Sequence, residues 1–283
     1  MEIIKNYEHK LTPEEKWEQA TLANNFIFYK VMRHHPEACK QLLEMLLGIK
    51  IESMEMKQEE TIALDYDSKG IRLDVFVKDT GRMFDVELQV ANTKELPERA
   101  RYYQGVMDVD TLKAGQKYKE LRDSHIIFIC LEDVFKNGLP VNTFANICLE
   151  DGKTKFGDRT YKHFFFAPLC AKMIEDKEVK AFFEFLISNQ ASSSYTDELK
   201  NYVADAKQST ENKMQFMTWE RQRAYDLDAG IEIGREKGRN EKAVEDAERL
   251  LKMNLGTAEQ IATAVNLPLD QVLEIKEKVS VKA

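Results

Sequence analysis

The sequence is poor in residues that cross-link or interrupt a chain. Among its 283 residues are four cysteines, six prolines and twelve glycines. Cys39, Cys130, Cys148 and Cys170 lie far apart, with no CxxC pair and no histidine at ligand spacing. This argues against a disulfide framework or a zinc site. We expect buried thiols in a chain long enough to form a core without such links.

Long apolar runs are also missing from the sequence. The nearest, around residues 164–174, is interrupted by Pro168 and Lys172, whereas a bilayer span needs about 20 apolar residues. Residues 1–19 are too charged to resemble a signal peptide. We therefore expect a cytoplasmic protein that makes no use of a membrane.

Positive charge is in deficit: 41 Lys and Arg stand against 49 Asp and Glu, a net charge of -8. This excludes a protein that coats nucleic acid by gross positive charge, because such binding depends on Lys and Arg facing phosphates. The hydrophobic fraction of 43% is typical of globular proteins. At about 100–200 residues per domain, the length allows one large domain or two modest ones.

Helical patterns enclose a region of alternating apolar and polar residues. A first helix is predicted from the N-cap Thr12, and a second from Pro36 to Leu47, which Gly48 ends. A further helix is predicted from Leu96. The alternation and the short apolar runs predict strands at 60–67, 70–79, 82–90, 125–131, 144–150 and 161–167. This order predicts a mixed α/β (α+β) core.

The C-terminal part has a different composition. Gly230, Gly234 and Gly238 recur every four residues, and we favour a polar helical connector over a helix that packs closely in a dimer. Three short helices follow, with a capping box at Thr257 and Gln260. They form either a helix-turn-helix or a small packing or oligomerisation bundle. The expected domains are residues 1–190, a helical connector at 191–240, and a small helical piece at 241–283.

One predicted hairpin carries a cluster of acidic residues. If Thr80 and Gly81 form a two-residue loop, opposed residues have numbers that sum to 161. Asp74 then faces Glu87, with Gln89 beside them. Two carboxylates at such positions repel each other, and Mg²⁺ bound to both would relieve the repulsion. The alternative is that this is simply the water-exposed face of an antiparallel hairpin.

Several segments together carry a resemblance to a known family. They are NNFIFYKVM, RLDVFVKD, FDVELQ, LPERARYYQ, HIIFICLEDVF and ERQRAYDLDAGIEIGREKGR. In this combination the chain resembles the Rpn (recombination-promoting nuclease/transposase) family of the PD-(D/E)XK nuclease superfamily, over roughly residues 15–245. The resemblance implies a central mixed sheet flanked by helices, with a helical C-terminal extension.

The resemblance also implies roles for individual residues. Asp74 and Glu87 become the metal-binding carboxylates, and the backbone carbonyl of Leu88 adds a ligand for Mg²⁺. Gln89 takes a catalytic position where the superfamily usually has Lys. Members of this subgroup tend to have an acidic residue near Asn24 or Asn25, where this chain has two amides. The implied reaction is metal-dependent hydrolysis of DNA phosphodiester bonds by in-line attack.

The predicted helix after the hairpin supplies candidate nucleic-acid contacts. Arg99 and Arg101 can bind phosphates, and Tyr102 and Tyr103 can stack on bases. The alternative is that one tyrosine belongs to the core and that Glu98 pairs with an arginine at the surface.

Two functions therefore follow from the sequence. The first is a Mg²⁺-dependent DNA endonuclease of the Rpn type, with DNA as partner and self-association possible through the C-terminal helices. The second is a catalytically weakened relative that binds DNA or a protein, for which Gln89 and the amides Asn24 and Asn25 are the arguments.

Overall fold

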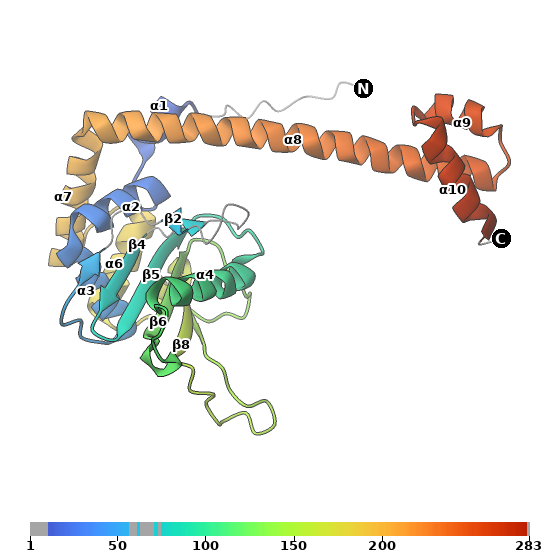
Figure 1. Ribbon diagram of the computed structural model, residues 1–283. Helices are drawn as coiled ribbons and strands as arrows, with labels where there is room; N and C mark the ends of the chain where they lie inside the picture. Colours follow the sequence, from blue (N-terminus) through green and yellow to red (C-terminus); the bar gives the residue numbers. More distant parts are fainter. Residues whose placement is uncertain (1–10, 57–60, 63–70, 73–74, 282–283) are drawn as a thin grey trace. The chain divides into compact units, whose positions relative to one another are not determined.

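The computed structural model describes residues 11–56, 61–62, 71–72 and 75–281 (Figure 1). The chain divides into two compact units, Met1–Phe216 and Met217–Ala283. The three-part division at 190 and 240 stays a prediction. Within the described ranges, no helix combines the length and the apolar character that a bilayer crossing requires.

The first unit is built on a six-stranded mixed sheet. The strand order is β1-β4-β5-β6-β8-β7. Strands β5, β6 and β8 run parallel, and β1, β4 and β7 pair antiparallel to their neighbours. The bounds are β1 (Glu55–Met56), β4 (Val75–Asp79), β5 (Arg82–Gln89), β6 (Asp123–Cys130), β7 (Val141–Phe144) and β8 (Thr160–Phe166). The predicted mixed α/β fold is confirmed.

Two short strands form a separate ladder, in which β2 (Thr61–Ile62) pairs antiparallel with β3 (Ile71–Arg72). The helices that lie wholly in the first unit are α1 (Pro13–Gln19), α2 (Asn25–His34), α3 (Pro36–Leu47), α4 (Leu96–Thr111), η1 (Tyr118–Glu120), α5 (Ala167–Met173), α6 (Lys177–Ser188) and α7 (Ser194–Gln208).

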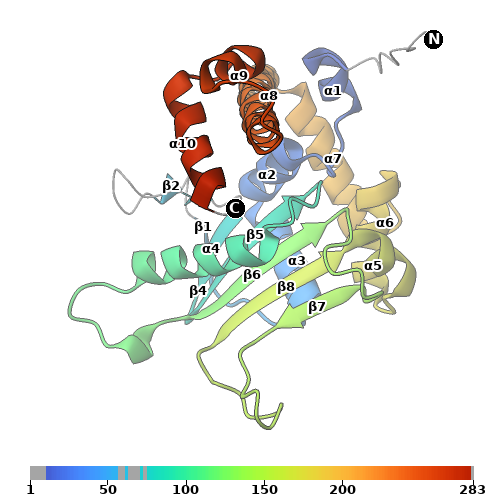
Figure 2. The same ribbon diagram turned by 90° about the vertical axis from the view of Figure 1, so that its right-hand side faces the viewer.

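Helices cover both faces of the sheet (Figure 2). On one face, α4 buries Ala100, Tyr103 and Met107 against apolar residues that include Phe76 and Phe128. On the other face, α2 contacts β4 and β5. Phe183 of α6 stacks on Phe165 of β8, with ring centroids 6.0 Å apart. The central strands are therefore covered on both sides, as parallel strands usually are.

The first helical stretch is interrupted. The capping box at Thr12 and Glu15 is present, with Glu15 N–H donating to Thr12 Oγ1 at 3.2 Å. However, α1 ends at Gln19, and α2 begins after a new N-cap, Asn24. The prediction of one helix from Thr12 through this segment is wrong, because the residue before Asn25 caps a helix instead of continuing one.

The strand predicted at 144–150 is also misplaced. Strand β7 ends at Phe144, because its pairing with β8 sets its position from Val141↔Phe165 to Phe144↔Lys162. Beyond it, Ile147 forms only an isolated bridge to Lys155. Alternation of residue types fits this loop equally well, so sequence pattern alone could not find the end of the strand.

The predicted hairpin register is confirmed for Val75–Asp79, whereas Ile71 and Arg72, at the start of the predicted strand, pair with β2 and not with β5. Strands β4 and β5 pair from Val75↔Val86 to Asp79↔Arg82, so each pair of numbers sums to 161, as predicted. The loop is Thr80-Gly81, and Gly81 has a φ of 77°, in the region that favours glycine. The next pair, Asp74 with Glu87, involves a residue outside the described part of the chain and stays a prediction.

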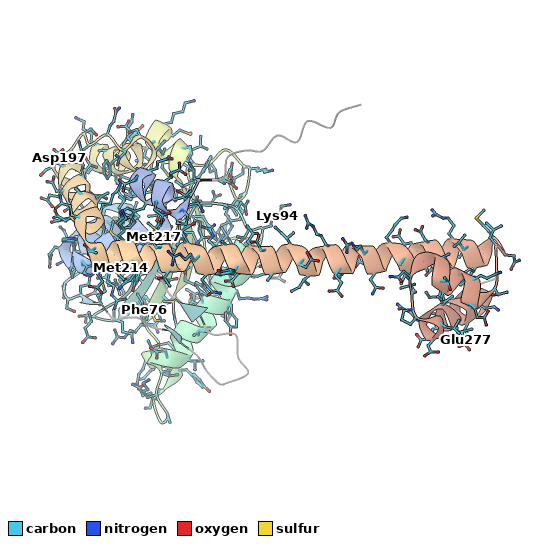
Figure 3. All side chains as sticks on the ribbon, turned by 90° about the horizontal axis from the view of Figure 1, so that it is seen from above. Phe76, Lys94, Asp197, Met214, Met217 and Glu277 are labelled. Carbon is cyan, nitrogen blue, oxygen red and sulfur yellow. The ribbon has the colours of Figure 1, made fainter. Side chains whose placement is uncertain are left out.

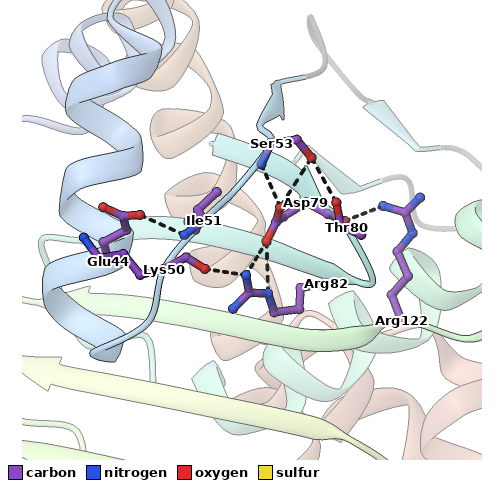
Figure 4. A network of polar contacts seen from close by, with 8 residues as sticks. All are labelled: Glu44, Lys50, Ile51, Ser53, Asp79, Thr80, Arg82 and Arg122. Carbon is purple, nitrogen blue, oxygen red and sulfur yellow. Dashed lines mark hydrogen bonds and ion pairs between the residues drawn. The ribbon is translucent and has the colours of Figure 1, made fainter.

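A polar network holds this hairpin loop in place (Figure 4). The Asp79 side chain is buried at 3% exposure. Its Oδ1 accepts from Ser53 N–H at 3.1 Å, and its Oδ2 accepts from Arg82 Nε at 3.0 Å. Arg122 Nη1 also donates to the Asp79 carbonyl at 3.0 Å. The loop is thus tied to the segment before β1 and to the start of β6.

The same contacts set the ionisation of Asp79. Burial by itself raises the pKa of this carboxyl, but the N–H groups of Ser53 and Thr80 and the Arg82 guanidinium together lower the pKa below its ordinary value. A carboxyl with a lowered pKa stabilises the folded state above its unfolded pKa. That contribution is lost as the pH falls through the folded pKa.

The second unit ends in a small helical bundle. Helix α8 (Thr210–Lys252) begins in the first unit and continues through the glycine-containing segment without a break. Its end packs with α9 (Ala258–Val265) and α10 (Leu269–Val281) around Ala247, Ile261 and Val272. The predicted capping box at Thr257 and Gln260 is confirmed.

We predict that Asp79→Asn lowers the free energy of unfolding by about 2 kcal/mol at neutral pH, because it removes charge-assisted hydrogen bonds to a buried group. Urea unfolding followed by tryptophan fluorescence measures this. The gap from wild type should shrink as the pH falls through the folded pKa of Asp79. The exposed Asp228→Asn is the matched control, with an expected change within about 0.5 kcal/mol. Equal stability of Asp79→Asn and wild type at neutral pH would contradict the role of the network.

Candidate active site

Three polar side chains form a buried row on β5. Asp85, Glu87 and Gln89 alternate with apolar residues, so they share the sheet face that α4 covers. Their exposed fractions are 0%, 0% and 6%. Their β6 neighbours in the ladder are Ile126, Phe128 and Cys130. The interpretation of a water-exposed face is therefore wrong for these three residues.

Glu87 takes part in a charged network with α4. Arg99 Nη2 forms an ion pair with Glu87 Oε2. Gln89 Nε2 donates to the same carboxylate oxygen at 3.0 Å, and Arg99 Nη1 donates to Gln89 Oε1 at 3.2 Å. A buried carboxylate needs such partners, because an uncompensated charge away from water is costly.

Tyr103 supports the network from one turn along α4. Its hydroxyl oxygen accepts from Arg99 Nε at 2.8 Å, and its ring centroid lies 5.0 Å from the guanidinium carbon. Burial, followed by the negative charge of Glu87, raises the pKa of Tyr103 well above its ordinary value. Tyr103 is thus a neutral phenol that holds the Arg99 side chain over the site.

The structure separates the predicted nucleic-acid contacts into two pairs. Arg99 and Tyr103 face the buried row, and Tyr103 is only 8% exposed. Arg101 and Tyr102 lie on the exposed side of α4. The alternative is confirmed in one respect, because Tyr103 belongs to the core. The partners of Arg99 include Glu87, Gln89 and Tyr103.

The catalytic and metal-binding candidates lie on or next to β5. Glu87 and Gln89 are brought into direct contact. Leu88 lies between them in the strand, with its side chain buried on the opposite face. Asp74 lies outside the described residues. Their assignment as catalytic and metal-binding residues stays a prediction.

The buried row supplies carboxylate oxygen, which is the kind of ligand atom that a hard divalent cation prefers. Magnesium in proteins is held by one or two carboxylates and keeps several waters. The buried Glu87 carboxylate is such a donor, and its hydrogen bonds orient it. In the described part of the chain, no three His, Cys, Asp or Glu side chains gather as a possible metal cluster. The predicted second ligand is the carboxylate of Asp74.

Asn24 has a structural task of its own. Its Oδ1 accepts from the N–H groups of Phe26 and Ile27 at 3.0 and 3.3 Å, which caps α2. An amide does this as well as a carboxylate does. The amide at this position therefore serves the helix start, whatever its effect on the site.

Sequence reasoning missed a second polar contact of α4. Gln104 is 7% exposed, and its Nε2 donates to Asp108 Oδ1 at 3.3 Å. Burial raises the pKa of Asp108, and the hydrogen bond from Gln104 opposes the rise. The one signal in the sequence was the spacing of four residues between the two, which places them on one side of a helix.

Comparison with known proteins gives one match. The profile of a family described as PD-(D/E)XK nuclease family transposase matches residues 26–228. No curated protein and no solved structure matches the chain. The matched range contains the buried row of β5 and all of α4.

We predict strong energetic coupling between Glu87 and Arg99. Arg99→Met alone leaves a buried carboxylate without its cation and should cost about 3 kcal/mol of stability. Adding Glu87→Gln to Arg99→Met should recover about 2 kcal/mol of that loss, because the stranded charge is removed. Urea unfolding of both single variants and the double variant measures the coupling. Arg101→Met, on the exposed side of the same helix, should cost little, and additive losses in the cycle would disprove the ion pair.

Proposed function

We propose that this chain, which belongs to the PD-(D/E)XK nuclease family of transposases, is a Mg²⁺-dependent DNA endonuclease. Family membership supports nuclease activity in general and implies DNA as substrate. Nucleases of this family generally use divalent metal ions. The observation that carries the proposal is the buried Glu87 carboxylate, in contact with Gln89 and Arg99.

In the proposed site, Asp74, Glu87 and the carbonyl of Leu88 hold the metal. When bound, Mg²⁺ lowers the pKa of a coordinated water and stabilises negative charge on phosphoryl oxygens. Gln89 orients the attacking water through its amide but does not take its proton, because an amide has no suitable pKa.

The exposed side of α4 is the proposed DNA surface around this site. Arg101 and Tyr102 are exposed there and can contact a phosphate and a base. Arg99 and Tyr103 form the inner edge. We place the activity in DNA recombination and in the cytoplasm. The last helix carries exposed Asp270, Glu274 and Glu277, so its charge does not favour DNA.

We expect the purified protein to cleave plasmid DNA with Mg²⁺ and to lose cleavage in EDTA. Asp74→Ala and Glu87→Ala should each lower the rate more than about 100-fold, since each removes a metal ligand worth several kcal/mol of transition-state stabilisation. Gel electrophoresis of nicked and linear products measures the rate. Glu98→Ala, an exposed carboxylate on α4, is the matched control and should cleave at the wild-type rate.

Two outcomes would count against the proposal. Equal cleavage by wild type and both variants would remove the site assignment. Absence of cleavage with any divalent metal, with folding confirmed by circular dichroism, would favour the second function, a weakened relative that binds DNA or a protein.

We further propose that two copies of the chain associate through α8. Residues 221–240 are all exposed (Figure 3). Leu227 and Ile231 are 55% and 40% exposed, and with Ala224 they follow the alternating spacing of three and four that forms a seam between helices.

Ile231→Lys should therefore weaken self-association by about tenfold or more, because it buries a charge in the seam. Light scattering after size-exclusion chromatography measures the mass over a range of concentrations. Ile233→Lys is the matched control: this isoleucine is 67% exposed but lies off the seam, so association should not change. A wild-type protein that stays monomeric at every concentration would refute the pairing.

A further inference from the structure

The guanidinium of Arg99 has a different partner at each nitrogen. Nε donates to the Tyr103 hydroxyl at 2.8 Å, Nη1 donates to Gln89 at 3.2 Å, and Nη2 pairs with Glu87. The carbon Cζ lies 5.8 Å from the Phe128 ring centroid. The aromatic rings and the phenol therefore hold one edge of the guanidinium, and its Nη edge faces the carboxylate and the amide.

The two ends of this ion pair differ in exposure. The Arg99 side chain is 31% exposed, whereas that of Glu87 is 0% exposed. Solvent thus reaches the arginine end of this ion pair but not the carboxylate end. Arginine binds phosphate through two parallel N–H groups, so the accessible cation suits a phosphodiester.

A divalent cation bound to Glu87 would weaken the ion pair between this carboxylate and Arg99. Glu87 Oε2 already accepts from Arg99 and Gln89, and a metal ion on this carboxylate would repel the nearby guanidinium. Once Glu87 becomes a metal ligand, Arg99 needs another anion. Gln89 cannot provide one, because its side chain is neutral.

We infer that Arg99 exchanges partners during the reaction, pairing with Glu87 in the metal-free protein and binding the scissile phosphate of DNA once Glu87 is a metal ligand. This inference rests on the proposed function and adds a phosphate-binding residue to it. It also gives the ion pair a second role: until the metal binds, Arg99 balances the negative charge of the buried Glu87 carboxylate.

The exchange predicts opposite effects of Arg99 on metal binding and on cleavage. Without DNA, Arg99 competes with the metal for Glu87. Arg99→Gln should therefore bind Mn²⁺ about fivefold more tightly than wild type, since a unit positive charge beside the site is removed. With DNA and Mg²⁺, the same variant should cleave about 100-fold more slowly, because a donor to the developing phosphoryl charge is lost.

Isothermal titration of Mn²⁺ into DNA-free protein tests the first effect independently of activity. Lys94→Gln, which removes an exposed cation from the loop before α4 (Figure 3), is the matched control and should bind Mn²⁺ as wild type does. Arg99→Lys keeps the positive charge, so it still tests the exchange if the glutamine variant does not fold. It should bind Mn²⁺ as wild type does yet cleave about tenfold more slowly, because lysine lacks the planar fork.

The outcomes separate this inference from the proposed function. A wild type that cleaves DNA, together with an Arg99→Gln variant that binds Mn²⁺ equally or more weakly, would overturn the partner exchange alone. Wild-type cleavage by Arg99→Lys would also overturn it. A wild type that neither binds Mn²⁺ nor cleaves DNA would overturn the proposed function and this inference with it.

Discussion

Glu87 lies at 0% exposure in the middle of the layer between the sheet and α4. An ionised carboxylate in such a place is tolerated only with a counter-charge and hydrogen bonds. Arg99 supplies the charge, and Gln89 supplies a hydrogen bond. Helix α4 must therefore lie across β5 in one register, because a shift by one residue would move Arg99 away from the carboxylate.

The surrounding structure keeps this register. At the other end of β5, the network of Asp79 with Ser53 and Arg82 holds the hairpin loop, and the parallel pairing with β6 fixes the height of the whole strand. Beneath α4, the apolar residues around Tyr103 and Phe128 form a core on the same face of the sheet as the row. The apolar surroundings lower the local dielectric and so strengthen the ion pair between Glu87 and Arg99. The ion pair in turn favours one position of α4 on the sheet.

Not every carboxyl group behind the net charge of -8 lies at the surface. Two of the carboxyl groups that enter this count, those of Asp85 and Glu87, are buried and do not contribute to the charge of the surface. Gross charge excludes indiscriminate coating of DNA, but it leaves room for a short contact through Arg101 and its neighbours on α4.

Local chemistry determined much of this protein in advance. The loop at Thr80-Gly81, the hairpin register, the capping boxes at Thr12 and Thr257, and the polar row of β5 all follow from residues close in sequence, because turns, caps and alternation depend on near neighbours. Only the tertiary structure decided that this row is buried, that Asn24 starts a new helix, and that Arg99 turns toward Glu87. These depend on which helix covers which sheet face, and that is settled by packing between segments distant in the chain.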